Sequence, residues 1–126
     1  MCGSVVRPDV VLFGEALPSD FWTKASTDFP TCDLLIVLGT SLTVAPFNSL
    51  VTKPGRSVPR VYVSKSKPGA AGGFLPWLMG LGGNVNFSRS SDLIVQDDCD
   101  QTVRKLCRLV GWEEELDALP YDIMEP

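Results

Sequence analysis

The segment 33–39, with the sequence DLLIVLG, constrains the fold more than any other part of the chain. Its five consecutive large apolar residues show no polar alternation, which is typical of a short strand covered on both faces. Small residues follow at 39–41, and Pro46 is placed to open a helix that runs to Val51. We therefore predict an α/β fold with a mostly parallel sheet.

Shorter patterns predict the other elements. They are a strand or extended segment at 9–13, a helix begun at Pro18 with an apolar face of Phe21, Trp22, Ala25 and Phe29, strands at 60–64 and 92–95, and one or two helical turns within 113–119. We interpret the aromatic face after Pro18 as core packing. The glycine-rich stretch 69–83 is expected to form a compact connection, and the residues from Pro120 a loose tail.

The clearest helix signal follows the last predicted strand. Apolar residues at 103, 106, 107 and 110 have the spacing of one helix face. Asp98 is the expected N-cap, with Gln101 three residues later as in a capping box, and Gly111 is the expected stop. We therefore predict a helix between Asp98 and Gly111.

Composition and charge exclude several classes of function. The chain of 126 residues has a net charge of -4 and only isolated Lys or Arg pairs, so we expect no direct nucleic-acid ligand. The longest apolar run, 34–38, is too short to span a bilayer, and the start has no signal-peptide pattern. We expect one domain in a soluble, intracellular protein without a membrane partner. The sequence has no histidine, so an imidazole base would have to come from elsewhere.

Two segments that follow predicted strands are candidate ligand positions, because ligands of parallel sheets bind at the carboxyl ends of the strands. Residues 39–41 offer hydroxyls and backbone N–H groups, and the turn at 97–99 presents N–H groups at a helix start. Ordinary turns and caps use the same residues. The residues alone leave both interpretations open.

The four cysteines are Cys2, Cys32, Cys99 and Cys107. They form no C-x-x-C pair and no spacing that completes a metal site within this chain. By themselves they indicate buried thiols rather than a disulfide framework.

Taken in order, four segments resemble the sirtuins, the NAD-dependent protein deacylases, and most closely the cytoplasmic branch of class I. The segments are RPDVVLFGEALP at 7–18, DLLIVLGTSLTVAPF at 33–47, MGLGG at 79–83, and CDQ to LVGW between 99 and 112. The resemblance implies that residues 1–119 are the C-terminal half of a Rossmann-like doubly wound catalytic domain, with its small zinc module essentially absent. It also implies a flexible tail at 120–126 and a cytoplasmic location, with the nucleus as the alternative.

The resemblance implies where NAD would bind. The implied cofactor-binding residues are Gly39, Thr40, Ser41, Ser64 and Cys99. Ser64 stands where many sirtuins have an asparagine that binds the adenine ribose, and a serine hydroxyl can also bond a ribose hydroxyl. Cys99 matches a residue whose backbone lies against the adenine.

The resemblance also implies an acetylated lysine peptide as the substrate. The implied substrate-binding residues are Val11, Leu12, Phe13, Gly14, Glu15 and Val44. The peptide would be held by strand addition between the first loop and the one that contains Val44 and Pro46. An apolar tunnel there would reject a free lysine, because burying an unpaired ammonium is costly.

The function implied is that of a NAD-dependent protein lysine deacetylase, which transfers acetyl from lysine to ADP-ribose and releases nicotinamide. Cys2 matches the last of four structural zinc thiolates, so zinc is expected only if three further cysteines are supplied. The family's phosphate loop and catalytic histidine have no counterpart in this sequence, so we expect a truncated form without a catalytic residue, inactive alone. The alternative is a non-catalytic fragment or interaction module that retains a peptide or ADP-ribose surface. The half sheet is expected to expose an apolar edge.

Overall fold

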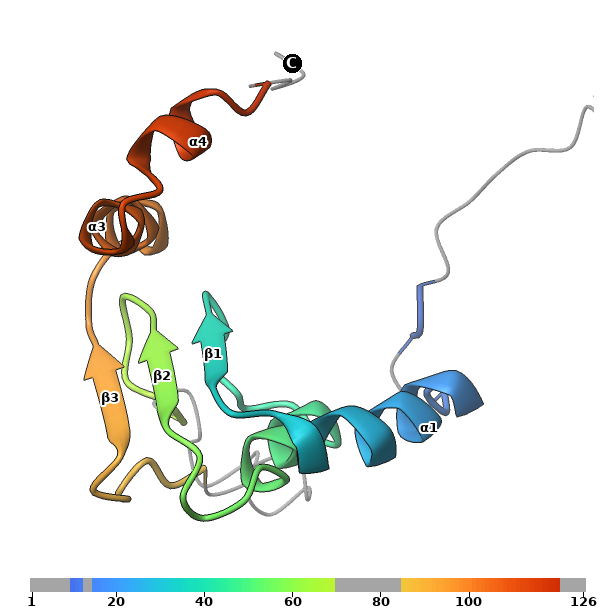
Figure 1. Cartoon of the computed structure of the whole chain (residues 1–126). Helices are drawn as coiled ribbons and strands as arrows, with labels where there is room; N and C mark the ends of the chain where they lie inside the picture. The colour runs from blue at the N-terminus through green and yellow to red at the C-terminus, as the bar shows by residue number, and fades with distance from the viewer. Residues whose placement is uncertain (1–9, 13–14, 70–84, 121–126) are drawn as a thin grey trace, which may run out of the picture.

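The sheet consists of three short parallel strands. The computed structural model describes residues 10–12, 15–69 and 85–120, and within them the strands are β1 (Leu35–Leu38), β2 (Arg60–Val63) and β3 (Asp92–Val95) (Figure 1). The order is β1-β2-β3, with both pairs parallel. Sequential parallel strands are what the second half of a doubly wound sheet contains. The predicted α/β class, a partial Rossmann-like fold, is therefore confirmed.

The helices lie around this sheet rather than over both of its faces. They are α1 (Ser19–Asp28), which continues as the 3-10 turn η1 (Phe29–Thr31), the 3-10 helix η2 (Phe47–Thr52), α3 (Cys99–Val110) and α4 (Glu113–Asp117). In Figure 1, α1 extends away from the sheet, while α3 and α4 lie beyond the carboxyl ends of the strands. The carboxyl ends of the strands are thus next to the start of α3.

The core is small and is centred on β2. Val37, Leu42, Val51 and Tyr62 are its buried apolar members. Beside them, Arg60 is almost fully buried and donates through Nε to Asp92 Oδ1 at 2.8 Å. Because Arg60 lies on β2 and Asp92 on β3, this ion pair connects neighbouring strands. A buried pair of this kind is costly to break.

Each of the three guanidinium nitrogens of Arg60 donates a hydrogen bond. Its Nη1 donates to the carbonyl of Val51 and its Nη2 to the carbonyl of Asn86, each at 2.9 Å. Its guanidinium also lies over the Phe87 ring, 4.6 Å from the centroid. The Arg60 hydrogen bonds lower the pKa of the Asp92 carboxyl below its usual value.

Strand β1 is less covered than its sequence predicted. Only Val37 is buried, and Ile36 and Leu38 are 43% and 47% exposed. Within the described residues β1 pairs with β2 alone, so the predicted apolar edge is confirmed. The prediction of cover on both faces was wrong, because alternate side chains of a strand point to opposite faces and only one face of β1 meets the core.

The aromatic face of α1 was also predicted to be core, and this was wrong. No residue of α1 is buried, and Trp22 is 43% exposed. Phe21 and Trp22 contact each other edge to face, with ring centroids 5.0 Å apart. Phe21, Ala25 and Phe29 are only half-buried, so within the described residues the apolar face of α1 is not part of the core.

Two further predictions need correction or qualification. Residues 10–12 form no strand, so of that prediction only the extended alternative is left, and the Glu15 amide donates to the Leu12 carbonyl at 3.0 Å. The helix after Pro46 forms as a 3-10 helix of six residues. The predicted connection at 70–83, the tail from 121, Phe13, Gly14 and Cys2 all lie outside the described residues.

The helix after Asp98 is confirmed with its caps. The Asp98 side chain accepts from the amides of Asp100 and Gln101, and Gly111 ends the helix with φ 80. The other half of a capping box is missing, because the Asp98 amide donates to Asp97 Oδ1 at 2.8 Å rather than to Gln101. In the parts of the chain that the structure describes, no helix is long and apolar enough to cross a membrane.

Candidate functional site

A polar hollow lies where the three strands end and α3 begins. It has a volume of about 380 Å³, and we call it the strand-end hollow. The residues that line it are Gly39, Ser64, Lys65, Asp98, Cys99 and Asp100. Three of them, Gly39, Ser64 and Cys99, are predicted cofactor-binding residues that come from three separate segments. Their convergence matches the position at which parallel α/β sheets bind ligands.

Gly39 lies at one wall of this hollow and needs to be glycine. Its φ is +67, a left-handed conformation that residues with a Cβ adopt at a cost. Its amide donates to the Val63 carbonyl at 3.0 Å, which joins the end of β1 to the end of β2. An added Cβ would lie 3.8 Å from Cys99 Sγ, at ordinary contact distance. Glycine therefore allows the left-handed backbone conformation, and it adds no side chain to that wall of the hollow.

Ser64 and Cys99 are held by backbone groups of neighbouring strands. The Ser64 amide donates to the Val95 carbonyl at 3.2 Å, and the Ser64 hydroxyl accepts from the Ser66 amide at 3.4 Å. The Cys99 thiol donates to the Val63 carbonyl at 3.6 Å. These contacts fix the end of β2 against the start of α3.

Several N–H groups at the start of α3 have acceptors within the chain, so the turn at 97–99 presents fewer free donors than predicted. Asp98 Oδ1 accepts from the Asp100 amide at 3.0 Å and from the Gln101 amide at 3.3 Å. The Thr102 amide donates to the Asp98 carbonyl. Since its own residues take these donors, the first turn of α3 is capped and offers little to a phosphate.

Two lining residues of the strand-end hollow form an ion pair. Lys65 Nζ lies 3.0 Å from Asp98 Oδ2. The hydrogen bond with Asp98 raises the pKa of Lys65, and the same bond with Lys65 lowers the pKa of Asp98. Both groups are therefore charged at neutral pH. Lys65 and Asp100 were missed as candidates by sequence reasoning, although Lys65 follows directly after a predicted strand, whereas Asp98 lies in the predicted candidate turn at 97–99.

Thr40 and Ser41, the other predicted cofactor-binding residues, make different contacts. The Thr40 carbonyl accepts from the Tyr62 hydroxyl at 2.8 Å, and its side chain lines an apolar hollow below β1. The Ser41 hydroxyl lies 3.0 Å from the Thr43 hydroxyl. The structure thus gathers only part of the predicted cofactor set in the strand-end hollow.

A second hollow gathers the described members of the predicted substrate-binding set. We call it the peptide hollow; it has a volume of about 180 Å³ and is lined by Val11, Leu12, Glu15, Leu17, Val44, Ala45 and Pro46. Two segments about thirty residues apart in sequence therefore share one hollow, as predicted. Leu17 and Ala45 are additional lining residues that the sequence did not single out.

The Glu15 carboxylate organises one side of the peptide hollow. Glu15 Oε2 accepts from the Leu12 amide at 2.9 Å, while the Glu15 amide returns a bond to the Leu12 carbonyl. Leu12 and Val44 are 65% and 49% exposed, so apolar surface remains open there. The hollow suits an apolar or neutral group better than a charged one.

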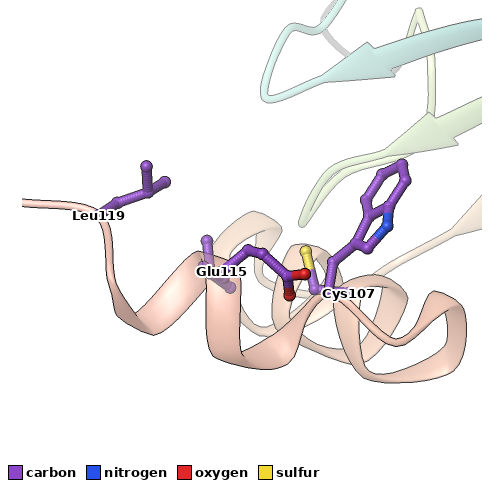
Figure 2. A pocket seen from close by; sticks show the side chains of 5 residues that line it. Cys107, Glu115 and Leu119 are labelled. Atoms are coloured by element: carbon purple, nitrogen blue, oxygen red, sulfur yellow. The ribbon is translucent and has the colours of Figure 1, made fainter.

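A third hollow, between α3 and α4, contains none of the predicted site residues. It is lined by Cys107, Trp112, Glu115, Leu116 and Leu119. Figure 2 shows Cys107, on α3, and Glu115, on α4, among these lining side chains. Its lining is mainly apolar and holds no paired polar groups that would orient a ligand.

No metal centre occurs within the described part of the chain. No group of three or more His, Cys, Asp or Glu residues there could hold a metal ion. Cys32, Cys99 and Cys107 are free thiols. Cys2, the predicted zinc ligand, lies outside the described residues, so that prediction stays a prediction.

The sheet and its strand-end hollow define the chain as part of a Rossmann-like α/β protein. The family model described as "Sir2 family" matches residues 1–46. The chain is 42% identical to the NAD-dependent protein deacetylase sirtuin-2 of Danio rerio over 121 residues and 45% identical to the NAD-dependent protein deacetylase hst2-1 of Emericella nidulans over 115 residues. It is 39% identical to the NAD-dependent deacetylase sir2A of Dictyostelium discoideum. The chain is therefore similar to members of the Sir2, or sirtuin, family.

These similarities cover nearly all of this chain but only part of each relative. The matches include 94%, 91% and 94% of this chain, and 32%, 27% and 22% of the Danio, Emericella and Dictyostelium proteins. The chain thus spans about a third or less of the length of the relatives it matches.

Proposed function

We propose that this chain supplies adenosine-side NAD contacts and acetyl-lysine peptide contacts of a NAD-dependent protein lysine deacetylase. The observation that carries the proposal is the convergence of Gly39, Ser64 and Cys99 in one polar hollow at the carboxyl ends of parallel strands. Relatives whose names describe NAD-dependent protein deacetylases support the same activity.

The chemistry of the strand-end hollow suits the adenosine part of NAD. The Ser64 hydroxyl and the carboxylates of Asp98 and Asp100 can bond ribose hydroxyls or adenine nitrogens. The Asp100 and Gln101 amides of α3 are already bonded to Asp98, so this hollow is less suited to the pyrophosphate. When bound, NAD would supply the ribose carbon that accepts the acetyl oxygen and the nicotinamide that leaves.

The peptide hollow suits the acetylated lysine segment of a protein substrate. Val11, Leu12 and Val44 offer apolar contacts from two facing segments. An acetylated lysine is neutral and can enter such a lining, whereas a free ammonium would lose its hydration without a partner. Main-chain pairing with residues 10–12 would add affinity without fixing the substrate sequence.

The chain offers no imidazole base for the reaction, because it contains no histidine. Of the described carboxylates that line the strand-end hollow, Asp98 pairs with Lys65 and caps α3. Removing a general base typically lowers a rate by about 10²- to 10⁴-fold. We therefore propose that the 126-residue chain binds ligands without turnover, which also favours the second candidate, a non-catalytic interaction module.

Two measurements test the proposal. Isothermal titration of the purified chain with ADP-ribose should show saturable binding with one site, and an assay with acetylated peptide and NAD should show no deacetylation. Val44→Asp should weaken binding of an acetylated peptide, while Thr52→Asp, an exposed position outside the hollow, serves as the matched control. Absence of ADP-ribose binding would refute the NAD part, and turnover by homogeneous protein would refute the missing-base part.

Three finer assignments are also proposals that rest on the sequence resemblance. They are membership of the cytoplasmic branch of class I, a cytoplasmic location with the nucleus as the alternative, and a structural zinc held by Cys2 only where three more cysteines are supplied. Imaging of the tagged chain tests the location. The metal site is tested by zinc analysis of a protein that contains Cys2 and the three supplied cysteines, with and without the Cys2→Ser substitution.

A further inference from the structure

The strand-end hollow is acidic, although its proposed cofactor is an anion. Its charged lining residues are Lys65, Asp98 and Asp100. Two carboxylates and one ammonium leave a net negative charge, and the hollow has no arginine among its described lining residues. Such a lining favours a neutral part of a nucleotide over a phosphate.

Asp98 is fixed in place by bonds to both of its carboxylate oxygens. Oδ1 accepts from the amides of Asp100 and Gln101, and Oδ2 accepts from Lys65 Nζ. The Asp98 carbonyl also accepts from the Thr102 hydroxyl at 2.8 Å. The carboxylate therefore cannot turn away from the hollow without uncapping α3.

Lys65 is the one cation among the described lining residues of the hollow, and it pairs with Asp98. The Lys65 side chain is 79% exposed, so little besides the ion pair restrains it. Exposed pairs are weak, and a phosphate nearby could compete for the ammonium if the carboxylate were absent. Asp98 thus removes the one group that could neutralise an added phosphate.

We propose that Asp98 is a specificity-determining residue, which makes the strand-end hollow accept an adenosine ribose with free hydroxyls and reject one that carries a 2′-phosphate. This inference rests on the proposed function, because it takes the hollow as the adenosine-side site. It takes the NAD of the proposed function as given and assigns the discrimination against a 2′-phosphate to one carboxylate and the ammonium that it holds.

The chemistry follows from charge. A phosphate monoester carries about -1.5 to -2 charges at neutral pH, so Asp98 and Asp100 would repel it, whereas a ribose hydroxyl can donate to either carboxylate. Dinucleotide-binding folds commonly use an acidic residue for the free hydroxyl and an arginine for the phosphate. The strand-end hollow has the acidic arrangement.

The test compares ADP-ribose with its 2′-phosphate by isothermal titration of the full chain. The wild-type chain should prefer ADP-ribose by about tenfold or more, since one additional repulsive contact in a solvated site corresponds to about that factor. Asp98→Asn keeps an N-cap acceptor, removes the charge and releases Lys65, so the preference should fall about tenfold. Asp97→Asn is the matched control, because Asp97 pairs with Lys105 and does not line the hollow.

A double variant separates the two parts of the inference. Adding Lys65→Met to Asp98→Asn should remove the affinity gained for the 2′-phosphate, because the released ammonium is the group that binds it. Unchanged affinity for the phosphate would overturn the role given to Lys65. Circular dichroism should show the same helix content in all variants.

The outcomes distinguish this inference from the proposed function. If the wild-type chain binds ADP-ribose and its 2′-phosphate equally, or if Asp98→Asn keeps the full preference, the specificity role of Asp98 is refuted while the adenosine site stands. If ADP-ribose does not bind at all, the proposed function fails, and the inference falls with it.

Discussion

The hydroxyl of Tyr62 donates a hydrogen bond to the carbonyl oxygen of Thr40 at 2.8 Å. Tyr62 is fully buried in β2, and Thr40 follows the end of β1. The bond therefore connects the core to the loop that runs from the strand-end hollow toward Val44 and the peptide hollow. Removing this hydrogen bond should lower both the free energy of unfolding and the affinity for ligands.

Tyr62→Phe tests this connection. The variant removes one net hydrogen bond and leaves the Thr40 carbonyl without its partner, so the free energy of unfolding should fall by about 0.5–1.5 kcal/mol. Urea denaturation followed by circular dichroism measures the change. An unchanged midpoint would show that the Thr40 carbonyl finds water instead and that the bond contributes nothing.

Gly39→Ala tests the left-handed residue at the wall of the strand-end hollow. At φ +67 an alanine should cost about 1–2 kcal/mol of stability. The added Cβ would also point toward Cys99 Sγ, so ADP-ribose binding should weaken. Gly111→Ala is the matched control: it has φ +80 with open space around it and lies outside the hollow. It should lose similar stability and keep binding, and equal loss of binding in both variants would contradict the account.

The Arg60–Asp92 pair predicts how stability depends on pH. Hydrogen bonds from Arg60 lower the pKa of the Asp92 carboxyl from its ordinary value of 3.8. A lowered folded-state pKa stabilises the fold above the unfolded value, and this contribution is lost as the pH falls through the folded value. The free energy of unfolding should therefore decline below about pH 4.

Asp92→Asn isolates this contribution. At pH 7 it should cost about 3–5 kcal/mol, because it leaves the Arg60 charge buried without its counterion. The decline in acid should be shallower than in the wild-type chain. Urea denaturation at several values between pH 2.5 and 7 measures both, and parallel pH curves for the two proteins would contradict the assignment to Asp92.

The exposed side of β1 predicts self-association of the chain. Ile36 and Leu38 lie on an edge strand and are nearly half exposed. Open apolar edges pair with other chains. Ile36→Lys should therefore lower the sedimentation coefficient measured at high concentration with little loss of stability, since the side chain is already exposed. A wild-type chain that stays monomeric at every concentration would contradict this prediction.

Local signals in the sequence were enough for the elements that the structure bears out. The apolar run of β1, the short strand patterns at 60–64 and 92–95, and the cap and stop of α3 each depend on neighbouring residues only. Three strands and the best-capped helix were thus predictable within one or two residues.

Burial was not predictable in the same way. The apolar faces of α1 and β1 indicated core positions, but whether a face is buried depends on which element packs on it. Within the described residues no residue of α1 is buried, and only one face of β1 meets the core. A sequence pattern shows that a surface can be buried, and only the tertiary arrangement shows whether it is.

The candidate site was predictable for residues whose position is determined by the end of a strand. Gly39, Ser64 and Cys99 converge because parallel strands end at one edge of the sheet. Thr40 and Ser41 follow the same strand, yet the loop turns there and Leu42 adopts a positive φ of 54, so their contacts lie elsewhere. The Lys65–Asp98 pair joins two distant segments and carries no local pattern.

The central claim is that one hollow at the strand ends binds the adenosine part of NAD. Titration of ¹⁵N-labelled chain with ADP-ribose, followed by amide chemical shifts, tests it most directly. The account predicts saturable shifts at Gly39, Ser64, Cys99 and Asp100. Shifts confined to the hollow between α3 and α4, or no shifts at any ligand concentration, would contradict it.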